Sequence, residues 1–465
     1  MRALIALGAA LLMAGCASFS DDGGFGPVQQ AAREQLGAEL RWARDDAARQ
    51  AIDTRVAELL AQPLDVESAV QLALLNHRGL QARFASLGLA EAEFVRASRL
   101  PNPGFSFGRM MQGDEREIER GLHLNLARWL VTPWMSDLQG RQMDLTRQTV
   151  LQAVLDHAHQ TRQAWVRAVA ADQTVHYMGQ VMQAAEASAE LARRMQAVGN
   201  FNTLQRAREQ AFYADAALNL ARAEQQQRAA RERLIRVLGL WGEQTAFRLP
   251  ERLPELPPEP ADRPALESET LAGRLDVRAA QMAVEQTGQS LGLTRSTRFI
   301  NVVDLGLSYN SSNEAPVQRG WELEFELPIF DLGQTRVVMA EQVWRQALDR
   351  AAEVAIDGRS ELREAYGQLR SAWAIARHHR EHIVPLRAQI AEQNLLRYNG
   401  MLIGVFDLLA DARVQIASVN AAIEAERDFW LAEADWRLAQ VGPARASAAA
   451  GPSASAPAAA GGDPH

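Results

Sequence analysis

The sequence of 465 residues contains one arrangement twice, and this repeat constrains the fold more than any single motif does. In residues 64–126, an Ala-rich amphipathic segment leads through a proline-marked break to two short alternating segments, and residues 271–327 keep that order. After each copy come a very long helical pattern, a Gly-containing turn and a further helix. We therefore expect two repeats, each of which joins a strand hairpin to a pair of long helices.

The alternating segments predict four strands of about ten residues, at about 103–111, 119–128, 301–311 and 319–328. Apolar residues occupy every second position, as in Leu122, Leu124 and Leu126, so each strand has one apolar and one polar face. A tilted strand that crosses a bilayer also has about ten residues. We therefore expect the strands to lie in a membrane; the alternative is a small soluble sheet.

The polar face of the last strand is acidic, because Glu322, Glu324 and Glu326 alternate with apolar residues. In a barrel these glutamates would face the lumen, although a solvated sheet face would divide the residues in the same way. Four strands cannot close around a lumen, and an open sheet edge leaves backbone groups unpaired in lipid. Three copies of the chain, with about twelve strands, would close the barrel.

Long helical patterns follow each pair of strands, at roughly 137–197 and 334–398. In the second pattern, apolar residues recur at the spacing of a coiled-coil seam, which Pro385 is expected to bend or interrupt. We expect tips at about 199–203 and 399–405, and return helices at about 203–240 and 406–440. The first repeat opens with a helix that begins at its cap, Asp65, and runs to about Arg99.

The N-terminus predicts a lipoprotein signal. Residues 1–15 contain one Arg and an apolar run too short to span a bilayer, which indicates a signal peptide. Ala14 and Gly15 directly precede Cys16, the only cysteine, and this resembles a bacterial signal in which that cysteine becomes lipid-modified after cleavage. The alternative is ordinary signal cleavage. Residues 16–63 then form a tether with short helices.

The remaining chain divides into a first repeat at 64–242, a Pro-rich connector at 243–270, a second repeat at 271–442 and an Ala/Ser/Pro tail at 443–465, which we expect to be disordered. The net charge is −8 and no basic stripe is present, which argues against nucleic acid as a partner. The sequence has no phosphate-binding loop, nucleophile elbow or Cys/His metal pattern, so neither an enzyme nor a cofactor is expected.

Four motifs in this order resemble the TolC-like outer-membrane efflux protein family, and specifically its lipoprotein branch. They are DVESAVQLALLNH at 65–77, GNFNTL at 199–204, LPIFDLG at 327–333 and YNGMLIGVFDLL at 398–409. The resemblance covers about residues 64–441. It implies a mostly α-helical homotrimer whose twelve strands form one barrel in the outer membrane. That barrel would continue into a periplasmic tunnel of long coiled-coil helices.

The resemblance also implies a function and partners. The chain would be a passive exit duct for small molecules or metal ions, in a tripartite system with a periplasmic adaptor and an inner-membrane pump. Two alternatives are a lipid-anchored periplasmic adaptor and a coiled-coil scaffold without a pore. An adaptor, however, usually has one helical hairpin, whereas this sequence predicts two.

Family gates use acidic residues at the helix tips, and this pattern places Asp407 at the first acidic position. Ala410 occupies the usual second position, and Asp411 follows it. The alternative for Asp407 is simply to cap the returning helix. Tyr398 matches a tip aromatic residue of the family, where it would either gate or pack. Gly199, Gly400 and Gly404 are expected to permit the turns and to meet the adaptor.

One histidine pair is a weak candidate for metal binding. His378 and His382 are four residues apart, so they lie on one helix face and could chelate a transition metal. The alternative, a solvated helix face, is favoured.

Overall fold

The computed structural model describes residues 18–261, 270–298, 303–325 and 329–443. Cys16, Glu326 and nearly all of the C-terminal tail lie outside the described residues. Among the described helices, none has both the length and the hydropathy required to cross a bilayer.

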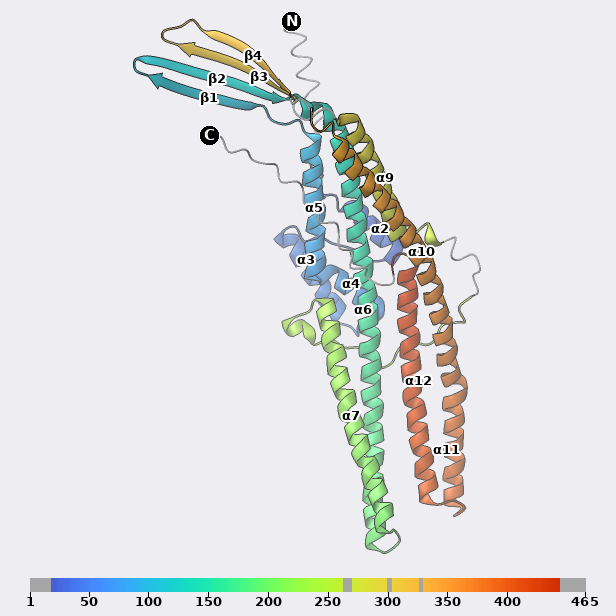
Figure 1. The fold of residues 1–465 in the computed structure, drawn as a ribbon. Helices are drawn as coiled ribbons and strands as arrows, with labels where there is room; N and C mark the ends of the chain where they lie inside the picture. Colours follow the sequence, from blue (N-terminus) through green and yellow to red (C-terminus); the bar gives the residue numbers. More distant parts are fainter. Residues whose placement is uncertain (1–17, 262–269, 299–302, 326–328, 444–465) are drawn as a thin grey trace.

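The structure confirms the predicted repeat. Each half leads through helices to a strand hairpin, and then to a long antiparallel pair of helices (Figure 1). The first half comprises α4 (Val66–Asn76), α5 (Arg78–Ser98), β1 (Gly104–Gln112), β2 (Glu115–Asn125), α6 (Leu126–Ala197) and α7 (Thr203–Leu238). The second comprises α9 (Leu275–Thr297), β3 (Val303–Ser312), β4 (Gln318–Phe325), α10 (Gln334–His378), a π-helical turn η2 (His379–Ile383), α11 (Val384–Asn399) and α12 (Val405–Ala439). Three short helices complete the described fold: α2 (Gly26–Leu36), α3 (Asp46–Leu60) and η1 (Gly242–Thr245).

The four strands form one antiparallel sheet in the order β1-β2-β3-β4. The sheet lies at one end of the molecule, and the helical hairpins α6/α7 and α10–α12 extend side by side to the other end (Figure 1). In the sheet, β2 from the first half pairs with β3 from the second, for example Leu122 opposite Leu307. The two repeats therefore share one sheet instead of forming two separate hairpins.

Two predicted boundaries move for local reasons. The second strand ends at Asn125, before Leu126, because the Asn125 side chain accepts a hydrogen bond from the Arg128 N–H at 2.7 Å and caps α6. The connection between the first two strands is shorter than the predicted bounds of 111 and 119 allow: it is a two-residue turn, in which Gly113 takes a φ of 63°.

The predicted opening helix is broken at His77, whose ψ of 115° is extended. The cap at Asp65 is as predicted, since its carboxylate accepts the Ser68 N–H at 2.7 Å. The break follows from a tertiary contact of the preceding residue. The buried amide of Asn76 donates to the carbonyls of Leu238 and Gly239, at 3.3 and 2.8 Å, and so satisfies the C-terminal end of α7.

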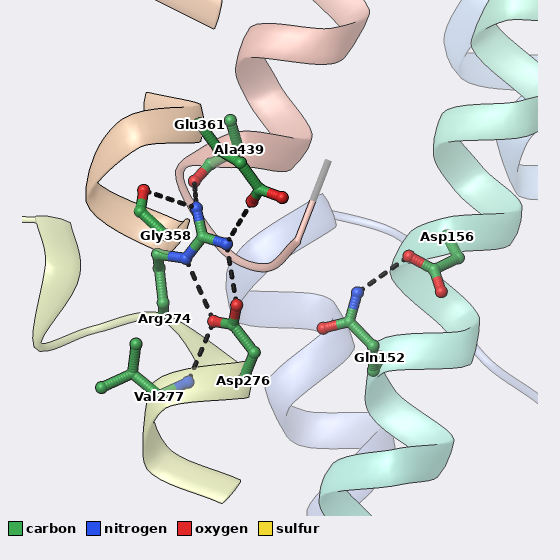
Figure 2. A network of polar contacts seen from close by, with 8 residues as sticks. All are labelled: Gln152, Asp156, Arg274, Asp276, Val277, Gly358, Glu361 and Ala439. Carbon is green, nitrogen blue, oxygen red and sulfur yellow. Dashed lines mark hydrogen bonds and ion pairs between the residues drawn. The ribbon is translucent and has the colours of Figure 1, made fainter. Parts of the chain in front are cut away.

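The second repeat has a charged side chain, not a neutral amide, at the corresponding place. Arg274, which precedes α9, is fully buried and donates to the Ala439 carbonyl at the end of α12 at 2.9 Å (Figure 2). It also pairs with Asp276 at 2.8 Å and Glu361 at 2.9 Å, and donates to the Gly358 carbonyl at 3.3 Å. One guanidinium thus joins α9, α10 and α12.

The core is concentrated at mid-height and in the first half. There α2, α3 and α4 pack on the middle of α6 and the end of α7, around Trp165, Leu72 and Leu234. The Trp165 indole donates to the Leu64 carbonyl at 2.7 Å. The second hairpin has a smaller cluster around Trp373 and Phe429.

Candidate channel wall and tip

The two faces of the sheet differ sharply in charge. One face carries the apolar rows, including Phe105 and Trp321, which are 70% and 72% exposed. All acidic residues of the described strands lie on the opposite face: Glu115, Glu117, Glu119, Asp304, Glu322 and Glu324. A face with this much exposed apolar surface requires a cover, because soluble proteins rarely leave such a patch open.

The sheet is also open at both sides. Within the part of the chain that the structure describes, β1 and β4 each pair with one neighbour, so the outer edge of each strand presents unpaired backbone groups. Of the predicted lumen residues, Glu322 and Glu324 lie on the acidic face opposite Gly306 and Asp304. Glu326 lies outside the described residues.

The start of the described chain runs beside α5, close to the sheet. The Ser20 N–H donates to the buried carboxylate of Glu91 at 2.8 Å. The guanidinium of Arg99, just after α5, lies 5.9 Å from the ring centroid of Phe19. The contact with Arg99 places Phe19 toward the end of the molecule that bears the strands.

The first helix tip is a compact turn between α6 and α7. Gly199 takes a φ of 81°, a left-handed value that glycine adopts without steric cost. Asn202 caps α7: its side chain accepts the Gln205 N–H at 2.9 Å, and the Gln205 side chain accepts the Asn202 N–H at 2.8 Å.

The second tip is built differently from what we expected. Gly400 and Gly404 have φ values of −79° and −81°, which other residues also adopt, and Met401 takes the left-handed value of 58°. Asp407 accepts the Gly404 N–H at 3.2 Å, so it caps α12, as the structural alternative predicted. Tyr398 is half-buried in the last turn of α11.

Asp411 points back into its own hairpin, where it accepts a hydrogen bond from the Asn394 side chain on α11. The structure thus brings the two predicted acidic tip residues to successive turns of α12. Asp407 is exposed at the tip, whereas Asp411 is half-buried one turn away.

An ion pair that the sequence did not suggest joins the two hairpins near their tips. Glu209 on α7 is only 2% exposed, accepts the Ser188 hydroxyl at 2.8 Å and pairs with Arg413 of α12 at 3.3 Å. The Arg413 guanidinium also lies 4.4 Å from the ring centroid of Phe212. We call Glu209 and Arg413 the inter-hairpin pair. Glu209 stands in a helix rich in Arg and Gln, so its sequence context gives no sign of burial.

The second hairpin is interrupted where Pro385 predicted it. The π-helical turn η2 directly precedes α11, in which Pro385 is among the first residues, and a wider turn accommodates the missing proline N–H. The Pro-rich connector lies along this hairpin. Its Pro257 and Pro254 carbonyls accept the indole N–H groups of Trp373 and Trp430, at 2.9 and 3.1 Å.

No protein-family model matches the sequence, and no curated protein sequence matches it. The structure, however, is similar to several solved channels. The Campylobacter jejuni outer membrane channel CmeC gives a TM-score of 0.69 at 16% identity, covering 91% of this chain and 92% of that chain. The open state of the Neisseria gonorrhoeae outer membrane channel MtrE gives 0.69 at 16% identity, covering 82% and 89%. CusC, described as forming a transmembrane channel, gives 0.68 at 15% identity, covering 81% and 92%.

The chain has the fold of outer-membrane channels. The expected TolC-like architecture is confirmed at the level of one protomer, with its sheet, its paired hairpins and its mostly helical content. In this channel fold, the sheet and the tip between α11 and α12 lie at opposite ends of the molecule (Figure 1), and Asp407 belongs to the first turn of α12.

The channel fold places the histidine pair on an exposed helix surface. The rings of His378 and His382 lie 5.2 Å apart between centroids, at the junction of α10 and η2. Within the described residues, no group of three or more His, Cys, Asp or Glu side chains could hold a metal ion. Both histidine side chains are exposed, so the solvated helix face stays the interpretation that the sequence favours.

Proposed function

We propose that the chain is one protomer of a trimeric outer-membrane channel that serves as the passive exit duct of an efflux system. The observation that carries this proposal is the open sheet, which has an exposed apolar face and two unpaired edges. Lipid would cover that face, and β4 of one protomer would pair with β1 of the next. Three protomers would supply about twelve strands, enough for an open lumen.

In such a barrel the apolar face points to lipid, so the carboxylates of the opposite face line the lumen. A dense acidic lining favours cations. The cargo would be small molecules or metal ions. The helical hairpins would continue the duct through the periplasm toward an adaptor and an inner-membrane pump, with the tips as the contact surface.

Lipidation of Cys16 would add a second anchor. The contacts of Ser20 and Phe19 beside α5 support this, because Ser20 is only four positions after Cys16. Four extended residues span at most about 14 Å, so the modified cysteine would stay near the end of the molecule that carries the strands.

Ion selectivity in planar bilayers tests the channel. We expect purified full-length protein to form trimers that conduct with a preference for cations. We expect Glu322→Gln/Glu324→Gln to lower the cation-to-anion permeability ratio several-fold, because both carboxylates would face the lumen. The control is Glu243→Gln, an exposed residue of η1 far from the sheet. A folded trimer that never conducts would falsify the proposal.

We propose that Asp407 has two roles, as the cap of α12 and as an acidic gate residue at the tip. Two substitutions separate these roles, because Asn retains a side-chain acceptor for the Gly404 N–H and Ala does not. If charge repulsion between protomers matters, Asp407→Asn and Asp407→Ala should change single-channel conductance alike. A change with Ala alone would leave Asp407 only the capping role.

A further inference from the structure

The arginines of the strands follow a strict distribution. All four arginines of the described strands, namely Arg109, Arg116, Arg120 and Arg319, lie on the same face as the exposed apolar rows. The carboxylates of these strands all lie on the other face. A strand face that only met hydrocarbon would carry no arginine, because a charged side chain in a bilayer is costly.

The arginines are also restricted to one end of that face. Next to the helices the rows are apolar: Leu124, Leu305 and Leu323 form one row, and Phe105, Leu122, Leu307 and Trp321 form the next. The following row contains Phe107, Arg120, Tyr309 and Arg319, and Arg109 and Arg116 lie nearer the hairpin turns. We call these four arginines the arginine band. It begins where the purely apolar rows end.

Aromatic and hydroxyl contacts hold the central pair of the band in place. The guanidinium carbons of Arg120 and Arg319 lie 5.6 and 5.5 Å from the ring centroid of Tyr309, and Arg120 also donates to the Ser311 hydroxyl at 3.4 Å. Among the described residues, no carboxylate lies within ion-pair distance of any of the four guanidinium groups. The counter-charge is therefore not supplied by the described sheet itself.

An anion that meets this surface must accept guanidinium hydrogen bonds and adjoin an apolar surface at once. A phosphate-bearing lipid satisfies both conditions, with its acyl chains on the apolar rows and its headgroup at the arginine band. Guanidinium groups bind phosphate through paired, charge-assisted hydrogen bonds.

We propose that the arginine band binds the phosphate groups of lipids in the membrane leaflet around the hairpin ends of the barrel. This inference rests on the proposed channel function, which places the sheet in a bilayer. It adds a lipid partner of defined chemistry and a fixed depth for the barrel: the hairpin turns lie at the headgroups, and the apolar rows lie in the hydrocarbon.

The test uses the full-length trimer in detergent, titrated with lipid A that carries its phosphates and with the same lipid after their removal. Binding is followed through the shift in thermal unfolding. We expect the phosphorylated lipid to bind at least about tenfold more tightly, and Arg120→Gln/Arg319→Gln to abolish this preference. The matched control, Arg208→Gln/Arg222→Gln on the exposed surface of α7, should retain it. Inorganic phosphate alone should neither stabilise the trimer nor compete.

Three results would overturn the inference: equal binding of both lipids, an unchanged preference in Arg120→Gln/Arg319→Gln, or full competition by inorganic phosphate. Conductance in phosphatidylcholine bilayers separates the two proposals. A wild-type trimer that conducts but shows no phosphate preference refutes the lipid partner alone. A trimer that does not conduct refutes the channel, and with it the membrane that the lipid partner requires.

Discussion

The two helical hairpins occupy equivalent places in the repeat but differ in continuity and packing. In the first, α6 runs unbroken over 72 residues and buries side chains along much of its length, among them Trp165 and Ala192. In the second, the π-helical turn η2 separates α10 from α11, and α11 buries none of its described side chains. The first hairpin thus contains one continuous helix with many buried side chains, whereas the second is interrupted and leaves α11 on the surface; we call them the frame and the arm.

The two repeats also differ in the contact that joins the start of each repeat to the end of its return helix. Both repeats use one buried polar side chain to satisfy the C-terminal carbonyls of the return helix. In the first it is the neutral amide of Asn76, inside a large apolar core. In the second it is Arg274, which also neutralises two carboxylates and stands beside a small cluster. The junction in the second repeat therefore depends on one buried charged side chain, Arg274, whereas the junction in the first repeat depends on apolar packing.

The largest expected effect comes from removing the Arg274 side chain. Arg274→Met removes the buried guanidinium that pairs with Asp276 and Glu361 and satisfies the Ala439 carbonyl, and we expect a loss of about 3–5 kcal/mol in the free energy of unfolding. Urea unfolding, with hydrogen exchange in α12, would measure it. The counterpart Asn76→Ala should cost only about 1–3 kcal/mol and should loosen α7 instead. The exposed Arg295→Met is the control, and equal losses in all three variants would refute the difference between the junctions.

Acid should weaken the first half selectively. Burial lowers the pKa of His157 from 6.5 to about 4, and the adjacent His77, 4.1 Å away between ring centroids, adds to this. The unfolded chain binds a proton at His157 below about pH 6.5, whereas the folded chain binds it only near pH 4. The contribution of the neutral His157 to the free energy of unfolding is therefore fully present above pH 6.5. It declines as the pH falls toward 4, by up to roughly 3 kcal/mol.

Urea titrations at pH 7.5 and pH 5 measure this loss, and hydrogen exchange locates it. We expect the middle of α6 to lose protection at pH 5 while α12 keeps it, because Arg274 does not titrate in this range. His157→Leu should flatten the pH dependence, and His176→Leu at an exposed position of the same helix should not. Loss of protection in both hairpins together would show that the halves are not independent.

The sequence predicted the repeat, the strands and the return helices to within a few residues, because period-two and heptad patterns depend on local burial. Of the features that it missed, the break at His77 and the burial of Glu209 depend on distant contacts. His77 breaks a helix that has no proline there, since Asn76 is engaged by the end of α7. Glu209 is buried by a partner about two hundred residues away. Met401, not a glycine, takes the left-handed position of the second tip.

The residues of the candidate channel wall and tip were also predictable in part. Alternation placed Glu322 and Glu324 on one face, and the structure shows that every acidic residue of the described strands joins them. The sequence of the second tip located Asp407 and offered both a gate and a helix cap, and the hydrogen bond from the Gly404 N–H shows the cap. The arginine band was invisible in the sequence because its members come from three strands and meet only through the register of the sheet.

Substitutions in the inter-hairpin pair test most directly whether the α10–α12 hairpin, the arm, moves relative to the α6/α7 hairpin, the frame. If the α10–α12 hairpin opens the tip by moving against α6/α7, the Glu209–Arg413 contact must break for the channel to open. We therefore expect single-channel conductance in planar bilayers to rise several-fold in both Glu209→Gln and Arg413→Gln, and to stay at the wild-type value in Glu392→Gln, an exposed position of α11. Wild-type conductance in both pair variants, assembled as intact trimers, would contradict the movable arm.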